Sequence, residues 1–194
     1  MIKKTLVLCS IFLFFIVNGC GPVLVAGGAA GAYKVATDER NVGEIWDDSA
    51  IEAQINLEFV RASGVNTANI DVDVVDGFVF LTGVVDSVEE AEKAEAIARN
   101  EPHVKEVKNQ LMIGSRSFGQ IIDDQVIGNK VKGALINEKG IRSLNIDVDV
   151  QKGVVFLTGI VENEDQHKRV LRIAEATSGA VKVTDNLKIR KSNE

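Results

Sequence analysis

The feature that most constrains the fold is an internal repeat. When the sequence is shifted by 76 residues, positions 47–113 align with positions 123–189 without a gap, and 22 of the 67 aligned residues are identical. The densest block, NIDVDV-x-x-G-x-VFLTG, spans Asn69–Gly83 in the first copy and Asn145–Gly159 in the second. Such a repeat indicates two copies of one structural unit. Because units of this size bury little surface alone, we expect the two domains to pack against each other.

Each copy predicts the same order of elements. Apolar residues recur at helical spacing after Asp47 and after Asp123, and the acidic residues there are candidate helix N-caps. An alternating IDVDV strand follows, and glycine in the next turn, Gly77 or Gly153, indicates a hairpin. The predicted later elements are strands at 78–85 and 154–161, helices at 88–100 and 164–176, and closing strands at 104–113 and 181–189.

These elements predict an α+β fold with two tandem domains. Each domain is αββαβ, with two helices on one face of a three-stranded mixed sheet. The sheet is mixed because the hairpin pairs its strands antiparallel, whereas the helical crossover brings the last strand in parallel. The second strand of each copy is nearly continuously apolar, so we expect it to be central and covered.

The N-terminus has the pattern of an export signal. Lys3 and Lys4 precede a 12-residue apolar run, Leu6–Val17, which is too short to span a bilayer and is followed by Gly19 and Cys20. This end resembles the lipobox of bacterial lipoproteins, which implies cleavage before Cys20 and acylation of its thiol. The alternative is an ordinary secretory signal in which the cysteine occurs by chance. The residue after the cysteine is not Asp, and the resemblance therefore implies a lipid anchor in the outer membrane, facing the periplasm.

Signal and repeat together divide the chain into six parts. They are a signal peptide (1–19), a lipidated tether (20–46), domain 1 (47–113), a linker (114–122), domain 2 (123–189) and a tail (190–194).

The αββαβ order and the hairpin motif D-G-x-V-F-L-T-G at Asp76–Gly83 resemble the BON domain. Two such units behind a lipobox resemble the dual BON-domain outer-membrane lipoproteins of the DolP type. The resemblance implies binding to phospholipid, especially anionic lipid, and a role in maintaining the outer membrane. It implies no enzymatic activity and no cofactor.

Charge and motifs exclude several other functions. A net charge of −6 argues against nucleic-acid binding, which needs a basic surface. The chain has no G-x-S-x-G, H-E-x-x-H or C-x-x-C motif, so we do not expect an enzyme. The strand aspartates Asp71, Asp73, Asp147 and Asp149 would need converging oxygens from elsewhere to bind a metal ion. We therefore predict a solvated strand face and no metal.

The two copies differ in charge, which points to a membrane-facing helix in copy two. Copy one holds 5 basic and 14 acidic residues, whereas copy two holds 10 of each. On the first helix of copy two, Lys130 and Lys132 lie near the apolar Val126 and Ile136, away from the core stripe. An apolar tip flanked by lysines is typical of a shallow contact with anionic phospholipid. The helix predicted from Asp123 carries no Trp or Phe, which weakens this interpretation.

Two alternatives remain open from the residues. Val126 and Ile136 could instead be buried against the acidic copy one, because exposed apolar patches mark either kind of contact. The protein is then either a lipid-binding protein of envelope maintenance or a periplasmic adaptor, chaperone-like, whose partners are envelope proteins.

Overall fold

The structure is a computed structural model that describes residues 42–190, with side chains from Asp48 onward. The predicted signal peptide, Cys20 and most of the predicted tether lie outside the described residues. Among the helices that are described, none combines the length and apolar character needed to cross a membrane.

Both domains have the predicted element order, with a short 3₁₀ helix added before the first strand. Domain 1 consists of α3 (Val42–Arg61), η1 (Thr67–Asn69), β1 (Ile70–Val75), β2 (Phe78–Val85), α4 (Val88–Asn100), β3 (Glu106–Asn109) and β4 (Met112–Ile113). Domain 2 consists of α5 (Phe118–Asn137), η2 (Ser143–Asn145), β5 (Ile146–Gln151), β6 (Val154–Val161), α6 (Glu164–Glu175) and β7 (Lys182–Ile189).

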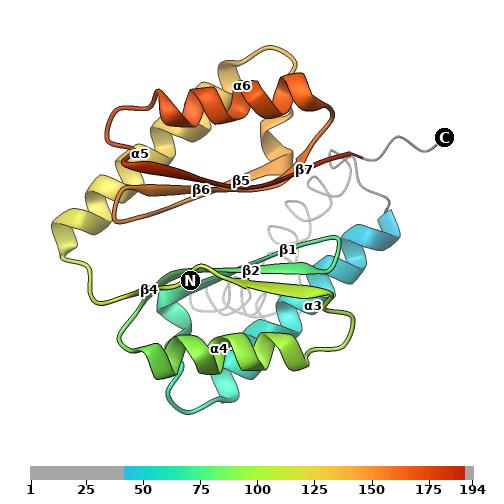
Figure 1. Cartoon of the computed structure of the whole chain (residues 1–194), viewed down its shortest axis with the longest axis vertical. Helices are drawn as coiled ribbons and strands as arrows, with labels where there is room; N and C mark the ends of the chain where they lie inside the picture. Colours follow the sequence, from blue (N-terminus) through green and yellow to red (C-terminus); the bar gives the residue numbers. More distant parts are fainter. Residues whose placement is uncertain (1–41, 191–194) are drawn as a thin grey trace, which may run out of the picture. The chain divides into compact units, whose positions relative to one another are not determined.

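Each domain has a mixed sheet with its helices on one face (Figure 1). β2 pairs antiparallel with β1 and parallel with β3 and β4, and β6 pairs in the same way with β5 and β7. The closing strand of domain 1 is interrupted, but its register continues: Leu81 lies opposite Asn109 and Val84 opposite Met112. The predicted α+β fold, with two αββαβ domains, is confirmed.

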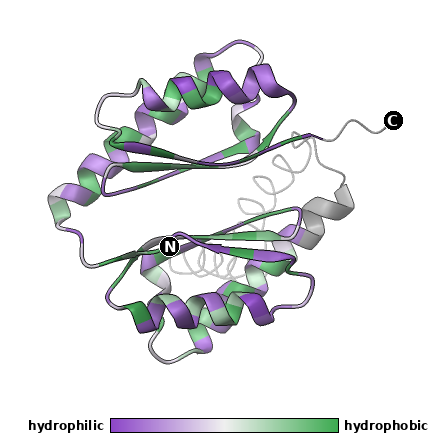
Figure 2. Ribbon diagram, in the orientation of Figure 1, coloured by the Kyte–Doolittle hydropathy of each residue, from purple (hydrophilic) through white to green (hydrophobic). Residues whose placement is uncertain are grey.

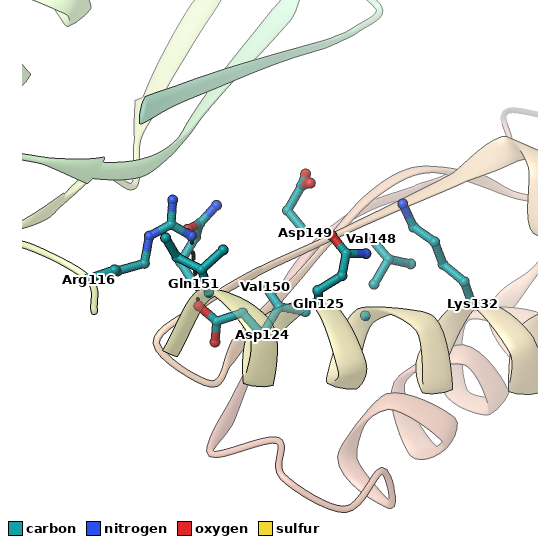
Figure 3. A pocket seen from close by; sticks show the side chains of 10 residues that line it. Arg116, Asp124, Gln125, Lys132, Val148, Asp149, Val150 and Gln151 are labelled. Carbon is teal, nitrogen blue, oxygen red and sulfur yellow. Dashed lines mark hydrogen bonds and ion pairs between the residues drawn. The ribbon is translucent and has the colours of Figure 1, made fainter. Parts of the chain in front are cut away.

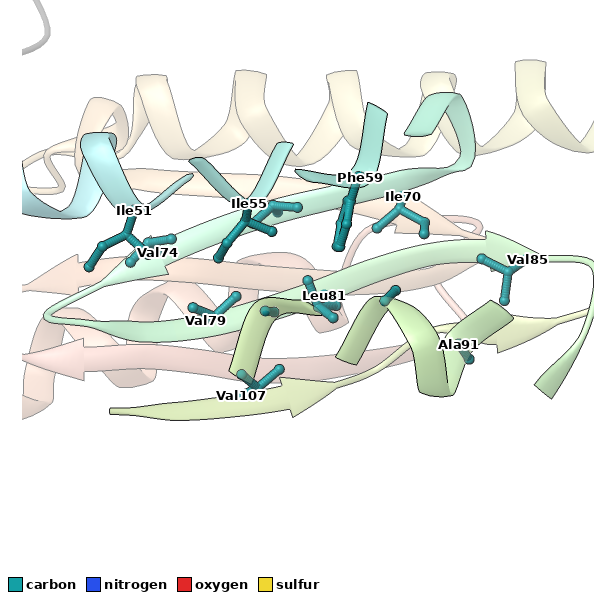
Figure 4. Close-up of a cluster of buried hydrophobic side chains, with 13 residues drawn as sticks. Ile51, Ile55, Phe59, Ile70, Val74, Val79, Leu81, Val85, Ala91 and Val107 are labelled. Carbon is teal, nitrogen blue, oxygen red and sulfur yellow. The ribbon is translucent and has the colours of Figure 1, made fainter. Parts of the chain in front are cut away.

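The helices pack on the sheets through the predicted apolar stripes. In domain 1, Ile55 and Phe59 of α3 are almost completely buried against β1 and β2, and small alanines let α4 approach closely (Figure 4). In domain 2, Val131 and Leu135 of α5 take the equivalent places. Hydrophobic residues are accordingly dense along the strands, whereas hydrophobic and hydrophilic residues alternate along the helices (Figure 2).

A buried aspartate anchors the hairpin of each domain. The Asp48 carboxylate accepts hydrogen bonds from the backbone N–H groups of Asp76 and Gly77, at 2.9 and 2.8 Å. In domain 2, the Asp124 carboxylate accepts equivalent bonds from the hairpin turn at 2.9 and 2.8 Å. The prediction that these aspartates are helix N-caps is wrong, because both helices start earlier and carry them inside, on the side that faces the turn.

Two glycines in each domain have backbone reasons for their place. Gly77 and Gly153 lie in the hairpin turns with φ of +74° and +77°, a left-handed conformation that glycine adopts without steric cost. The glycine that ends the FLTG motif is restricted more severely. A Cβ on Gly83 would lie 2.0 Å from the carbonyl oxygen of Asn69, and one on Gly159 equally close to that of Asn145. No other residue fits there without displacing the backbone.

The sheet faces opposite the helices are also covered. Several side chains are buried although they belong to neither helix-side core: Val75, Phe80, Thr82, Val84, Phe156, Thr158 and Asn186. β1 contacts β6, and β2 contacts β5, so equivalent strands meet reciprocally. The expectation that the two domains pack together is therefore confirmed, and we call this contact the junction.

Candidate functional site

The first helix of domain 2 begins earlier than its apolar period indicates. We expected a linker at 114–122, but α5 starts at Phe118. Ser117 and Gln120 form a capping box: the Ser117 side chain accepts from the Gln120 N–H, while the Gln120 side chain accepts from the Ser117 N–H. The signal for this start is present in the sequence as Ser-x-x-Gln before an apolar run.

The outer face of α5 carries exposed apolar residues along its N-terminal half and again near its C-terminal end. Its exposed large apolar residues, which we call the α5 crest, are Phe118, Ile121, Ile122, Val126 and Ile136. Phe118 is 78% exposed, so α5 carries an aromatic residue that the helix predicted from Asp123 did not include. Val126 and Ile136 are 46% and 67% exposed, so neither is buried against domain 1. The crest is larger than predicted because α5 includes five residues before Asp123, and three of them belong to the crest.

The two predicted lysines lie on opposite sides of the crest. At about 100° per residue, Lys130 falls roughly 40° to one side of Val126, and Lys132 roughly 40° beyond Ile136 on the other. Lys130 is exposed and its Nζ lies 3.4 Å from the carbonyl oxygen of Ser178. Lys132 is half exposed and its Nζ lies 3.5 Å from Asp147. The lysines therefore have different surroundings, and only Lys132 has a carboxylate beside it among the ion pairs described.

A cavity of about 200 Å³ lies between α5 and β5, on the side of Lys132. Figure 3 shows Arg116 at one end and Lys132 at the other, with Asp149 between them. Arg116 hydrogen-bonds to Gln151 and lies 3.7 Å from the buried Asp124. Ile121 of the crest and Asp149 on β5 both line the cavity, which therefore lies between the crest and the junction.

Polar contacts at the junction link equivalent positions of the two domains. Gln110 and Asn186 are equivalent in the repeat, and their side-chain amides exchange two hydrogen bonds of 2.8 Å. Lys188 of domain 2 reaches the hairpin of domain 1, where its Nζ donates to the Val75 carbonyl at 2.8 Å and lies 3.4 Å from the centre of the Phe78 ring. Burial lowers the pKa of Lys188, although the nearby Asp76 carboxylate partly opposes that shift.

The strand aspartates meet at the junction. One carboxylate oxygen each of Asp71, Asp147 and Asp149 lies within 4.8 Å of the others, although the residues come from different domains. The prediction of a solvated face holds for Asp71 and Asp147, which are exposed, and is wrong for Asp73 and Asp149. Each of these two has a fully buried Oδ2 atom. Burial first, and then the neighbouring carboxylates, raise the pKa of Asp73 and of Asp149 to about 8.

The repeat, the αββαβ order and the paired sheets define a class of protein. The family model for the BON domain matches residues 47–115 and 123–191. The chain therefore belongs to the BON-domain family and carries two copies of the domain, as the resemblance implied.

Three relatives show how far the similarity extends. The chain is 29% identical to the outer membrane lipoprotein DolP of Haemophilus influenzae over 184 residues, which cover 94% of this chain and 93% of the relative. It is 29% identical to the osmotically-inducible protein Y of Escherichia coli, covering 81% and 80% of the two chains. It is 31% identical to an uncharacterized protein in the gshII 5' region of Anaplasma centrale, covering 75% and 97%. The chain is thus a dual BON-domain protein of the DolP type.

Proposed function

We propose that this protein is an outer-membrane lipoprotein, anchored through Cys20 on the periplasmic face, that binds anionic phospholipid through α5. It acts in envelope integrity and not as an enzyme. Similarity to an outer membrane lipoprotein over 94% of the chain supports the location. The observation that carries the binding function is the α5 crest with Lys130 and Lys132 on its two sides.

The crest has the chemistry of an interfacial contact. Burying one large apolar side chain contributes about 1.5–3 kcal/mol, and each lysine near an anionic surface contributes about 1 kcal/mol. Phe118 is the largest apolar group of the crest and is 78% exposed, so it loses most of its contact with water when the helix touches a bilayer. Binding of this kind needs no enclosed lipid pocket.

Flotation with vesicles tests the binding function. The fragment 39–194, one compact unit without Cys20, is mixed with vesicles of neutral lipid or of neutral and anionic lipid at low salt. We expect flotation only with anionic lipid, and a reduction when salt shortens the reach of exposed charges to roughly 8 Å at physiological strength. Equal flotation with both vesicles, or with neither, contradicts the proposal, and the protein-binding adaptor then becomes the better hypothesis.

Charge reversal identifies the surface. Lys130→Glu/Lys132→Glu is expected to weaken flotation, whereas the equivalent change in domain 1, Gln54→Glu/Asn56→Glu, is expected to affect it far less. Because Lys132 also pairs with Asp147, Lys130→Glu alone provides the cleaner comparison. An equal effect of the domain 1 variant would show that total charge, and not α5, determines binding.

The lipid anchor is tested separately. Cys20→Ser is expected to abolish incorporation of a clickable fatty acid during growth, because the thiol is the proposed acylation site. Undiminished labelling of the serine variant would refute the anchor without affecting the vesicle result.

A further inference from the structure

The four strand aspartates form one group across the junction. Asp71 and Asp73 on β1 are equivalent to Asp147 and Asp149 on β5, and each pair lies on the sheet face that meets the other domain. One oxygen each of Asp71, Asp147 and Asp149 lies within 4.8 Å of the others. We call the four residues the junction aspartates.

Few positive charges compensate this group. On the α5 side, Lys132 lies 3.5 Å from Asp147, and Arg116 lines the same cavity as Asp149 but is held by Gln151 and Asp124. On the β3 side, Lys108 stands over the Phe80 ring, 5.4 Å from its centre. The helix of domain 1 contributes another negative charge, Glu52, which acts on Asp73. The neighbouring positions on β2 and β6 are neutral, namely Phe80, Thr82, Phe156 and Thr158. Unscreened carboxylates so close together repel one another.

Hydrogen bonding at the junction depends on protons. Among the described residues, no donor reaches the buried Oδ2 of Asp73. When Asp149 and Asp71 are both ionised, the Oδ2 of Asp149 also has no hydrogen-bond donor. When Asp149 is protonated, its carboxyl group forms a hydrogen bond with that of Asp71. That bond joins the domains, because Asp71 belongs to domain 1 and Asp149 to domain 2. Leaving a buried polar atom unpaired is costly. Protonation of these carboxyl groups therefore favours packing of the two domains, and packing of the domains favours protonation.

We propose that the junction aspartates make domain packing pH-dependent: the two BON domains are held together when Asp73 and Asp149 carry protons and separate when they lose them. The geometry of the junction supports this proposal, because four carboxylates from two domains converge there and two of them have a buried oxygen. Opening returns the buried carboxylate oxygens of Asp73 and Asp149 to water and relieves the repulsion among the four carboxylates.

The direction follows from the proton balance. The closed state has raised pKa values of about 8 for Asp73 and Asp149, against the ordinary 3.8 for an aspartate in the open state. The closed state therefore binds more protons between these values. Its advantage is fully present below pH 3.8 and is lost as pH rises towards 8. Within this window, the ratio of open to closed molecules rises about tenfold per pH unit for each proton released.

Energy transfer between the domains measures the opening. Fluorophores are attached to the full chain in detergent at Glu92→Cys and Lys168→Cys, equivalent exposed positions on α4 and α6. Cys9→Ser and Cys20→Ser leave only these two thiols, and a chelator removes divalent cations. We expect transfer to be higher at pH 5 than at pH 9, while circular dichroism stays constant because each domain remains folded.

The matched variants decide the cause. Asp73→Asn/Asp149→Asn is expected to keep high transfer at both pH values, and Asp73→Asn alone to make the pH profile shallower. Glu89→Gln/Asp165→Asn, at equivalent exposed positions outside the junction, is expected to behave as the unmodified chain. Constant transfer from pH 5 to pH 9 in the unmodified chain overturns the proposal. An unchanged pH profile in the double asparagine variant, or loss of transfer together with loss of the dichroism signal, does so as well.

Discussion

Helices α3 and α5 occupy the same place in the two domains and differ mainly on their outer faces. Both have 20 residues, and both bury an apolar stripe and a hairpin-anchoring aspartate. Five acidic residues and one basic residue lie in α3, whereas α5 has two of each. The positions of Lys130 and Lys132 are held by Gln54 and Asn56 in domain 1. The inward residues serve the fold of either domain, so the outer face of α5 is where a function specific to domain 2 is to be sought.

Exposed apolar residues alone do not separate the two helices. Val60 and Ile136 are equivalent in the repeat and are 70% and 67% exposed. The distinction lies in their neighbours. Ile136 is close to Lys132 on the helix surface, whereas Val60 lies between Glu58 and Arg61, whose side chains form an ion pair of 2.6 Å with each other. An apolar tip among positive charges favours an anionic membrane, and one in an acidic helix does not.

The largest effect is expected from the glycines that both domains share. Gly83→Ala and Gly159→Ala each place a Cβ 2.0 Å from a carbonyl oxygen, at φ of +137° and +140°. We expect each to lower the free energy of unfolding by about 3 kcal/mol or more, because the backbone has to move. Urea unfolding measures the loss. Gly133→Ala, at a helical site with nothing within 4 Å, is the control and should stabilise slightly. A tolerated change in only one domain would show that the two hairpins are not equivalent.

The second effect concerns the hairpin anchors. Asp48→Ala and Asp124→Ala each remove an acceptor for two backbone N–H groups in a turn. We expect each to cost about 2–3 kcal/mol, because charge-assisted hydrogen bonds are lost and buried donors stay unpaired. Thermal unfolding of the single variants checks this. If either loss is below about 0.5 kcal/mol, the carboxylate does not hold the turn.

The third effect distinguishes the helices by membrane binding. Phe118→Ala removes the most exposed aromatic group of the α5 crest, and we expect vesicle affinity to fall about tenfold, since loss of about 1.4 kcal/mol of apolar burial corresponds to that factor. Flotation at several lipid concentrations gives the affinity. Val60→Ala removes an exposed apolar residue from α3, so it is the control in domain 1 and should leave the affinity unchanged. A similar loss with both variants would place the membrane contact on both domains.

The smallest effect sharpens the comparison at the junction. Gln110 and Asn186 form the reciprocal amide pair, so Gln110→Ala, Asn186→Ala and the double variant make a double-mutant cycle. We expect a coupling energy of about 0.5–1.5 kcal/mol, typical of neutral hydrogen bonds. Urea unfolding of the four proteins measures it. Additive losses would mean that the amides do not contribute to holding the domains together.

Local sequence patterns account for much of this architecture. The hairpin strands Phe78–Val85 and Val154–Val161 and the helix Val88–Asn100 have the predicted bounds. Strand alternation, helical periodicity and turn glycines involve residues close together in the chain, so they can be recognised from the sequence alone. The repeat added the relation between the two halves of the chain. The early start of α5 was also encoded locally, in the capping box, but the polar composition of residues 114–120 suggested a linker.

Tertiary structure alone decided what distant residues do together. Aspartate is a common N-cap residue, yet Asp48 and Asp124 instead accept hydrogen bonds from turn residues that lie 28 and 29 positions later in the chain. Asp71 and Asp149 belong to strands of alternating polarity, and nothing in that period indicates whether the polar side faces water or a second domain. The sequence by itself determined the two folds and the charge difference between them. The packing of one sheet on the other determined which carboxyl groups leave water, and with that their protonation, because burial and neighbouring charge set a pKa.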